Sequence, residues 1–383
     1  SLAQIKPFYP IFFKNTMTNN KMKVLLCSPY GKKVGGIQRW TGHILNYYNK
    51  NETNVELKQF YPNKGGAYQN TSFLARVYLG IKSYLPFLAV LQKELKTNQY
   101  DVVHFVSSAS LSLVRDIISL KIARRRGVKT IVHFRFGRIP ELYEKQNWEQ
   151  KLLHSVINLT DKTVVIDQAS YYTLREQGYN NIELLPNPLT PQVAEIIKNN
   201  SNIEKEDRKI VFAGHVVRGK GVFELVEACK GIKNIKLKMI GYVTDDIKGK
   251  IKEEAGEDNE SWLEIAGEQS FENTIKEMLS AAVFVLPTYT EGFPNVIIES
   301  MACGCPIVTT CVGAIPEMLD IKNGNNHGIC VEPKNVKALK ESIQIMLNNR
   351  EYALECGKNA QRRVNELYSM SKVWNQLEVI WST

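Results

Sequence analysis

The sequence predicts an α/β protein with two doubly wound domains, each a parallel sheet covered by helices. Three observations lead to this prediction. At 383 residues the chain is too long for one ordinary hydrophobic core, which favours two domains. Short β-branched runs alternate with amphipathic stretches from Lys23 onward, and the alternation restarts in the second half. Between the halves, residues 185–191 hold three prolines, which suits a linker and not a helix interior.

Short apolar runs in the first half predict its strands. Between the first two runs, apolar side chains recur at helical spacing, which indicates a helix with one face toward the core. The strand runs are Val24–Leu26, Val55–Leu57, Val102–Phe105, Thr130–Val132 and Val164–Ile166. The helical stripe consists of Ile37, Trp40, Ile44, Tyr47 and Tyr48.

The second half repeats the pattern and ends in two amphipathic stripes. A last helix so apolar must bury one face, so we expect it to pack back on the first domain. The predicted segments are an N-terminal extension (1–22), two Rossmann-like domains (23–188 and 189–365) and a C-terminal helix (366–383). The strand runs are Ile210–Phe212, Ile235–Leu237, Leu263–Ile265, Val283–Leu286 and Ile307–Val308. The stripes are Val336, Leu339, Ile343, Met346, Leu347, and Val373, Trp374, Leu377, Ile380, Trp381.

The charge of the chain is unevenly distributed. The net charge is +10, and the basic excess lies in the first half. Its densest cluster, residues 121–129, suits an anionic membrane surface or a phosphate-bearing acceptor, and a solvated helix end is the alternative. No aromatic residues are interleaved with this cluster, which argues against nucleic-acid binding.

Several features predict a cytoplasmic protein. No apolar run approaches the ~18 residues that span a bilayer, and the first residues lack the pattern of a signal peptide. The seven cysteines are an odd number without paired C-x-x-C spacing, as expected of reduced thiols. Cys303 and Cys305 are interpreted as core residues because no second ligand pair accompanies them.

Doubly wound domains bind ligands at the carboxyl ends of their strands, which directs attention to three loops. The first, Pro29–Gly36, has glycines that could let backbone amides approach a phosphate, although a tight turn without a ligand is equally compatible. The second, Gly214–Gly221, ends with Lys220 where a helix begins, so an ammonium and helix amides could together bind a diphosphate. A basic surface loop is the alternative.

The third loop, residues 287–295, precedes a helix and places two carboxylates eight positions apart. Glu291 lies in the loop, and Glu299 lies on the helix between apolar neighbours. A carboxylate in such surroundings needs a partner. A ribose diol could supply two hydroxyl donors, and an arginine or a backbone amide could play a purely structural role. The residues alone leave both open.

The segment from Glu291, which reads EGFPNVIIESMACGCPIVTT, resembles the E-x7-E motif of the retaining glycosyltransferases of family 4, which have the GT-B fold. The resemblance extends over nearly the whole chain and is strongest from Val211 to Glu317. Its further pieces are Gly35-Gly36, His133, Leu185-Pro186-Asn187, Gly214–Gly221 and Gly313-Ala314-Ile315-Pro316-Glu317.

The resemblance implies a role for each matching position. Residues 23–188 would form the acceptor domain and residues 189–365 the donor domain. Glu299 would hold the ribose, Lys220 the diphosphate, and His133 would contact the sugar, unless it is a packed residue at a strand end. Gly35 and Gly36 would approach the phosphate from the acceptor domain. The donor sugar and diphosphate would be gripped by Glu291, Gly292, Phe293 and Asn295.

One position departs from the family pattern. The phosphate-binding loop of the family reads G-R-x-x-x-x-K-G, and His215 stands here in place of the arginine. Either a protonated His215 or Arg218 could supply the missing charge, and the bidentate geometry of arginine favours Arg218.

The predicted reaction moves a sugar from a nucleoside diphosphate sugar, UDP- or GDP-linked, to an acceptor hydroxyl with retention of configuration. No D-x-D metal motif is evident, so we expect no metal and no cofactor beyond this co-substrate, and activity that survives EDTA. A saccharide or lipid-linked saccharide acceptor, bacterial surface polysaccharide synthesis and a peripheral position on the inner face of the membrane follow from the resemblance. The alternatives are an epimerase or phosphorylase on the same fold, a carboxylate-pair glycosidase and a non-catalytic adaptor.

Overall fold

The structure is a computed structural model that describes residues 21–31, 35–62, 73–325 and 327–383. It contains two six-stranded sheets, and every strand pair in them is parallel. The expected extension lies outside the described residues up to residue 20, as do residues 32–34 of the first glycine loop. The doubly wound fold that the sequence predicts is confirmed.

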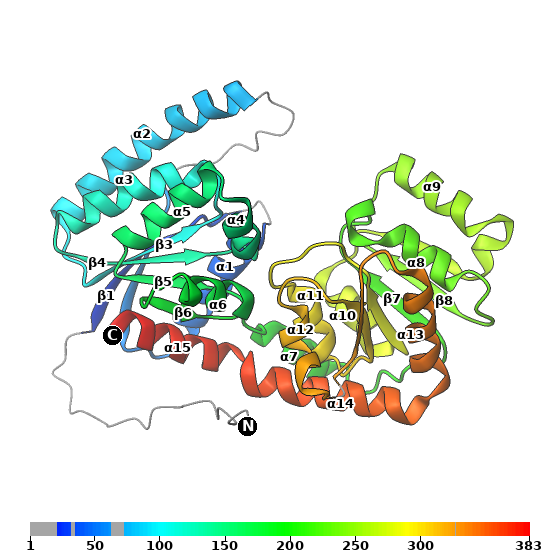
Figure 1. Ribbon diagram of the computed structural model, residues 1–383. Helices are drawn as coiled ribbons and strands as arrows, with labels where there is room; N and C mark the ends of the chain where they lie inside the picture. Colours follow the sequence, from blue (N-terminus) through cyan, green and yellow to red (C-terminus); the bar gives the residue numbers. More distant parts are fainter. Residues whose placement is uncertain (1–20, 32–34, 63–72, 326) are drawn as a thin grey trace, which may run out of the picture.

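The first sheet has the order β2-β1-β3-β4-β5-β6 and forms the N-terminal domain on the left of Figure 1. Successive residues of β1 point to opposite faces of the sheet: Val24 and Leu26 pack with α1 and α15 (Met370–Ser382), whereas Leu25 and Cys27 pack with α2, α3 and α5. The strands are β1 (Met22–Cys27), β2 (Val55–Phe60), β3 (Val102–Ser107), β4 (Lys129–Phe134), β5 (Lys162–Val165) and β6 (Ile182–Leu184). The helices are α1 (Gly36–Lys50), α2 (Phe73–Thr97), α3 (Ser112–Arg124), α4 (Ile139–Lys145), α5 (Trp148–Leu159) and α6 (Gln168–Glu176).

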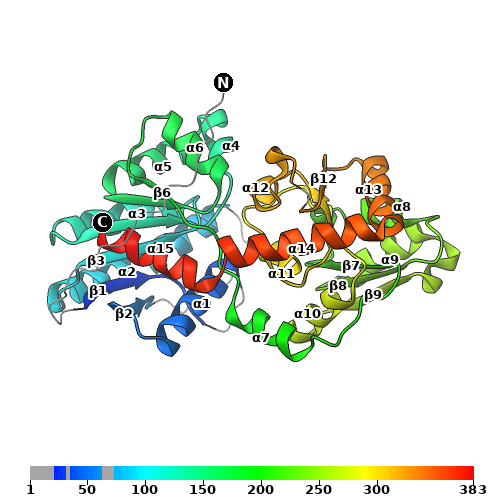
Figure 2. The same cartoon turned by 90° about the horizontal axis from the view of Figure 1, so that it is seen from below.

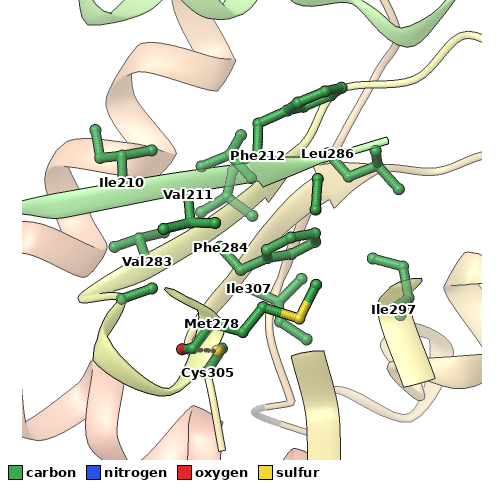
Figure 3. Packing of buried hydrophobic residues seen from close by; sticks show 14 of the residues in the cluster. Ile210, Val211, Phe212, Met278, Val283, Phe284, Leu286, Ile297, Cys305 and Ile307 are labelled. Atoms are coloured by element: carbon green, nitrogen blue, oxygen red, sulfur yellow. Dashed lines mark hydrogen bonds between the residues drawn. The ribbon is translucent and has the colours of Figure 1, made fainter. Parts of the chain in front are cut away.

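The second sheet has the order β12-β11-β10-β7-β8-β9 and belongs to the C-terminal domain. Its core is continuous: Phe212, Phe284 and Ile307 from neighbouring strands are fully buried, and the Cys305 thiol donates to the carbonyl of Met278 at 2.8 Å (Figure 3). The strands are β7 (Lys209–Ala213), β8 (Lys236–Ile240), β9 (Leu263–Gly267), β10 (Val283–Leu286), β11 (Ile307–Thr310) and β12 (Ile329–Val331). The helices are α7 (Pro191–Asn199), α8 (Val222–Cys229), α9 (Asp245–Ala255), α10 (Phe271–Ser280), α11 (Asn295–Ala302), α12 (Ile315–Met318), α13 (Val336–Asn348) and α14 (Arg350–Leu367).

The last helix, α15 (Met370–Ser382), leaves the C-terminal domain and packs under the N-terminal sheet (Figure 2). Its apolar stripe is buried with Val24, Trp40 and Ile44, and the indole of Trp381 donates to Nδ1 of His104 at 2.9 Å. Full burial stabilises each such side chain by about 1.5–3 kcal/mol relative to exposure.

The chain crosses between the domains twice, once before α7 and once before α15. The crossings lie side by side, because the amide of Leu189 donates to the carbonyl of Tyr368 at 2.6 Å.

The basic cluster at residues 121–129 is partly used for structure. Lys129 donates to the carbonyls of Ile380 and Trp381 at the end of α15, and Arg124 donates to the carbonyl of Leu159. Cations at a helix C-terminus are favourable because they bind the last carbonyl groups and oppose the helix dipole. Arg125 remains exposed.

Candidate active site

The carboxyl ends of both sheets face a cleft that holds two joined cavities. The larger, of about 640 Å³, is lined by the start of α1, the segment after β4 and the loops after β7 and β10. The smaller, of about 270 Å³, lies among the loops after β7 and β8 and the side of α11. Five residues line both cavities and mark their junction. They are Arg39, Gly214, His215, Lys220 and Val296.

Most of the residues expected at the site are brought together here. Glu299 lines the smaller cavity, whereas Lys220 and His215 line both. The larger cavity is lined by Gly35, Gly36, Glu291, Gly292, Phe293 and Asn295. The loops that carry the motif therefore converge on one cleft although more than 250 residues of chain separate their ends.

Lys220 and Glu291 form an ion pair in the wall of the cleft. A hydrogen bond joins the loops that carry them, since the amide of Tyr289 donates to the carbonyl of Gly219 at 2.9 Å. Gly221, in the same segment as Lys220, adopts φ +69°. A Cβ on Gly221 would lie 2.0 Å from the carbonyl oxygen of Pro287, so only glycine lets the two loops approach so closely.

Glu299 presents a carboxyl group without a protein partner. Among the residues that the structure describes, no side chain or amide forms a hydrogen bond or ion pair with it. Burial raises the pKa of this carboxyl to about 7, and the positive charge of Arg39 acts in the opposite direction. A half-buried carboxyl that faces a cavity and lacks a donor is suited to accept hydrogen bonds from ligand hydroxyl groups.

This raised pKa predicts a pH dependence of ligand binding. If a ribose donates to the ionised carboxylate of Glu299, the affinity for a nucleoside should fall about tenfold as the pH drops from about 8 to about 6, through the pKa of about 7. Isothermal titration of a nucleoside without phosphate measures this effect, because no phosphate then titrates in the same range.

The Glu299→Gln variant is the control. It should bind the nucleoside weakly and equally at both pH values, and a pH dependence retained in this variant would contradict the assignment.

The raised pKa of Glu299 also affects stability. The pKa in the folded protein exceeds the usual value of 4.5, so the stability that the protonated carboxyl provides is lost as the pH rises through about 7. In the Glu299→Gln variant, which cannot ionise at this position, the free energy of unfolding should not decrease over that pH range.

His133 lies elsewhere than the motif suggested. It is fully buried, in an edge-to-face contact with Trp40, and is not among the residues that line either cavity. The reason is that β4 continues to Phe134, so His133 belongs to the interior of the sheet. Burial lowers the pKa of His133 well below its usual value, aided by the charge of Arg135. The first residue beyond the strand, Arg135, faces the larger cavity instead.

Arg135 is a half-buried cation that the sequence motifs do not reveal. Its guanidinium lies 5.0 Å from the ring centroid of Trp40 and donates to Oδ1 of Asn187. Burial lowers its pKa to about 9, and none of the described carboxylates forms an ion pair with it. Asn187 in turn donates to the carbonyl of Phe293 at 2.9 Å and to Oδ1 of Asn295 at 2.8 Å. Arg135 therefore orients a side chain that joins the domains at the start of α11.

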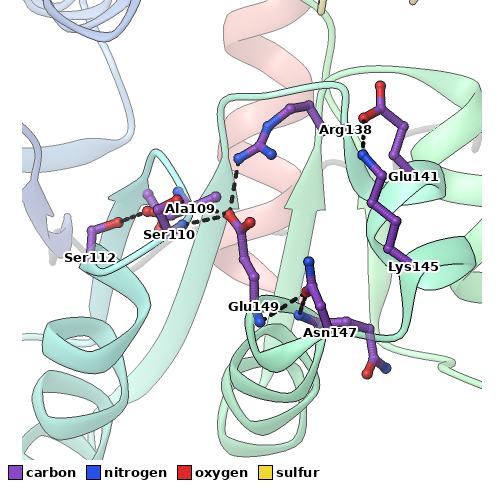
Figure 4. Close-up of polar contacts among 10 residues, drawn as sticks. Ala109, Ser110, Ser112, Arg138, Glu141, Lys145, Asn147 and Glu149 are labelled. Carbon is purple, nitrogen blue, oxygen red and sulfur yellow. Dashed lines mark hydrogen bonds and ion pairs between the residues drawn. The ribbon is translucent and has the colours of Figure 1, made fainter. Parts of the chain in front are cut away.

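A second arginine of this segment is neutralised. Arg138 lines the larger cavity and donates to Oε1 of Glu149 at 2.9 Å (Figure 4). The same oxygen accepts from the amide of Ser110 at 2.9 Å, and Asn147 caps the helix that carries Glu149. This network holds the segment after β4 against the neighbouring loop.

The domains also touch directly beside the larger cavity. A Cβ on Gly137 would lie 2.9 Å from the Cα of Gly292, so the backbones meet with no room for side chains. Nearby, Glu317 accepts a hydrogen bond at 2.5 Å from the amide of Gln168, the first residue of α6. Burial raises the pKa of Glu317 to about 8.

The two candidates for the missing phosphate-binding charge are placed differently. His215 lines both cavities, whereas Arg218 lines neither and lies over the ring of Phe223, 4.5 Å from its centroid. This placement does not support the preference for Arg218. Asp245 and Asp246 begin α9 and line neither cavity. No cluster of three or more metal-binding side chains occurs among the described residues.

Comparisons with known proteins give the family context. A sequence-family model described as Glycosyltransferase Family 4 matches residues 34–193, and a second family model, described as Glycosyl transferases group 1, matches residues 193–363. The capsular polysaccharide biosynthesis glycosyltransferase CapM of Staphylococcus aureus is 29% identical over 209 residues, which cover 48% of this chain and 50% of CapM. The chain spans about half the length of the first curated relatives that it matches.

Two further relatives extend the comparison. The N-acetylgalactosamine-N,N'-diacetylbacillosaminyl-diphospho-undecaprenol 4-alpha-N-acetylgalactosaminyltransferase of Campylobacter jejuni is 26% identical, and the match covers 69% of this chain and 72% of that enzyme. The crystal structure of Alr3699/HepE of Anabaena in complex with UDP superposes with a TM-score of 0.66 at 15% identity, and the match covers 95% of this chain and 100% of HepE. The latter likeness confirms the GT-B arrangement of the two domains.

Proposed function

The chain belongs to glycosyltransferase family 4, and on that premise we propose that it transfers a sugar from a nucleoside diphosphate sugar to an acceptor hydroxyl with retention of configuration. The observation that carries the proposal is the convergence of Lys220, Glu291 and Glu299 on two joined cavities between the domains. The cavities form a continuous site for a ligand with two different ends.

Each end of such a donor has a matching surface. The nucleoside occupies the smaller cavity, where the ribose hydroxyls donate to Glu299. The sugar occupies the larger cavity beside the loop that begins at Glu291 and ends at the first amides of α11. The diphosphate lies at the junction, where Lys220 and the amides at the start of α11 oppose its charge.

The separation of the two carboxylates argues against a glycosidase. In that mechanism two carboxyl groups flank one glycosidic bond. Glu291 lines only the larger cavity and Glu299 only the smaller, and Glu291 is already paired with Lys220. An epimerase on this fold differs in a simple way, because it would convert its nucleotide sugar with no acceptor present.

Retention is proposed to proceed without a covalent enzyme intermediate. The bond from the anomeric carbon to the diphosphate oxygen breaks, the acceptor oxygen forms the new bond on the same face, and the leaving diphosphate takes the acceptor proton. The protein supplies position and electrostatic stabilisation of the leaving group. We propose that backbone amides and cationic side chains of the protein provide this stabilisation without a metal ion or a further cofactor.

The donor is proposed to be UDP- or GDP-linked and the acceptor a saccharide or lipid-linked saccharide of a bacterial surface polysaccharide. Bound UDP in the HepE structure and the diphospho-undecaprenol-linked saccharide named for the Campylobacter enzyme support this choice.

A peripheral position on the inner membrane face is proposed as well. It fits the exposed apolar side chains of Leu85 on α2 and of Val114 and Ile118 on α3, together with the exposed Arg125 just after α3. No described helix is long and apolar enough to span a membrane.

A nucleotide panel tests the proposal. UDP, GDP, ADP and CDP are added to the protein, and thermal unfolding is followed; a ligand at ~100 times its dissociation constant stabilises the fold by about 2.7 kcal/mol. One of the four should raise the melting temperature, and its sugar conjugates should then support transfer in the presence of EDTA. No shift with any of them would refute the proposal, and a strict need for added Mg²⁺ or Mn²⁺ would refute its metal-independent form.

A further inference from the structure

The diphosphate position proposed above has too little positive charge from the C-terminal domain. Lys220 is the one permanent cation that this domain contributes to the described junction, and its ammonium is already paired with Glu291. His215 stands in place of the arginine that the family pattern has, and Arg218 lines neither cavity and lies over the ring of Phe223. A bound diphosphate therefore needs a further cation.

Arg39 of the N-terminal domain lies at the required place. It is the fourth residue of α1, and it lines both cavities together with Lys220 and His215. Because the diphosphate joins the nucleoside to the sugar, any residue that lines both cavities lies beside it. The first residues at this end of α1, Gly35 and Gly36, line the larger cavity as well. The helix dipole therefore adds to the positive charge of the guanidinium.

The guanidinium of Arg39 is also uncommitted. Its side chain is exposed, and no hydrogen bond or ion pair joins it to any other described residue. Its charge nevertheless reaches the site, since it lowers the pKa of the Glu299 carboxyl and that of His43. Arginine suits this role because its planar fork can donate two parallel hydrogen bonds to phosphate oxygens.

We infer that Arg39 binds the donor diphosphate from across the cleft and replaces the arginine that the family pattern has at the position of His215. This inference rests on the proposed function. It gives the diphosphate one cation from each domain, Arg39 from the first and Lys220 from the second.

Affinities of three variants test the inference. Isothermal titration is carried out with the nucleoside diphosphate that binds the unaltered protein and with the same nucleoside lacking phosphate. Arg39→Gln should weaken diphosphate binding about 10- to 100-fold and leave nucleoside binding unchanged. Arg39→Lys, which keeps the charge but loses the fork, should fall between. Arg350→Gln is the matched control, because Arg350 is exposed and lines neither cavity, and it should stay within about twofold of the unaltered protein.

The outcomes separate this inference from the proposed function. If the unaltered protein binds none of the nucleotides, the proposed function fails and this inference fails with it. If it binds a nucleoside diphosphate and Arg39→Gln binds it equally well, this inference alone is overturned. Equal losses for nucleoside and nucleoside diphosphate would also overturn it, because they would indicate a structural role. Unchanged melting of the ligand-free variants verifies that they are folded.

Discussion

Replacing Lys220 by alanine is expected to lower the rate of sugar transfer about 100- to 1000-fold. Lys220 lies at the junction of the two cavities. The proposed function puts the leaving diphosphate there, and this group gains negative charge as its bond to the sugar breaks. A fixed cation in a partly enclosed site stabilises that charge without reorganisation. The loss should appear mainly in kcat, with a smaller loss of nucleotide affinity. Steady-state transfer and titration of the nucleoside diphosphate measure the two effects.

Lys233→Ala is the matched control, because Lys233 is exposed and lines neither cavity. It removes the same charge from the same domain and should leave the rate within about twofold. Glu291→Gln should also slow transfer. Since Lys220 and Glu291 are in contact, the double variant should lose less than the product of the single losses. A Lys220→Ala enzyme that keeps the rate of Lys233→Ala would exclude Lys220 from the diphosphate site.

The sequence was sufficient for the main features of the fold because hydrophobic periodicity is a local property. The alternation of apolar runs and helical stripes located ten of the strands, and the stripe of α15 indicated a buried helix. The strands that it does not reveal, β6 and β12, have three residues each and lie at sheet edges. Runs so short carry too little periodicity to distinguish a strand from a loop.

The site was predictable where one segment contains the whole signal. Glu291 and Glu299 lie eight positions apart in one loop and helix, and the structure places both in the cleft. Arg39 and Arg135 carry no comparable signal, because their positions depend on how the two domains meet. His133 does not line the cavity for a local reason: it lies within β4, which runs on to Phe134, and Arg135 just beyond the strand lines the cavity.

Replacing Gly313 by alanine is expected to disable transfer although Gly313 lines neither cavity. Gly313 has φ +56°, and a Cβ there would lie 2.2 Å from the carbonyl oxygen of Glu291 and 2.8 Å from that of Gly292. Both neighbours are backbone atoms, so the loop that carries Glu291 must move. A displacement of about 1 Å at a reacting site can cost about 100-fold in rate. We therefore expect a loss of at least that size in transfer.

Gly324→Ala separates this clash from backbone strain. Gly324 has φ +68°, and a Cβ there would meet open space, with no heavy atom within 4 Å. Both variants force alanine into the left-handed region, which costs about 1–2 kcal/mol. Gly324→Ala should therefore lose that stability and keep its transfer rate. Gly313→Ala should lose more stability and most of its activity, as measured by chemical denaturation and a transfer assay. Equal transfer rates in the two folded variants would mean that the contact between Gly313 and Glu291 does not position the site.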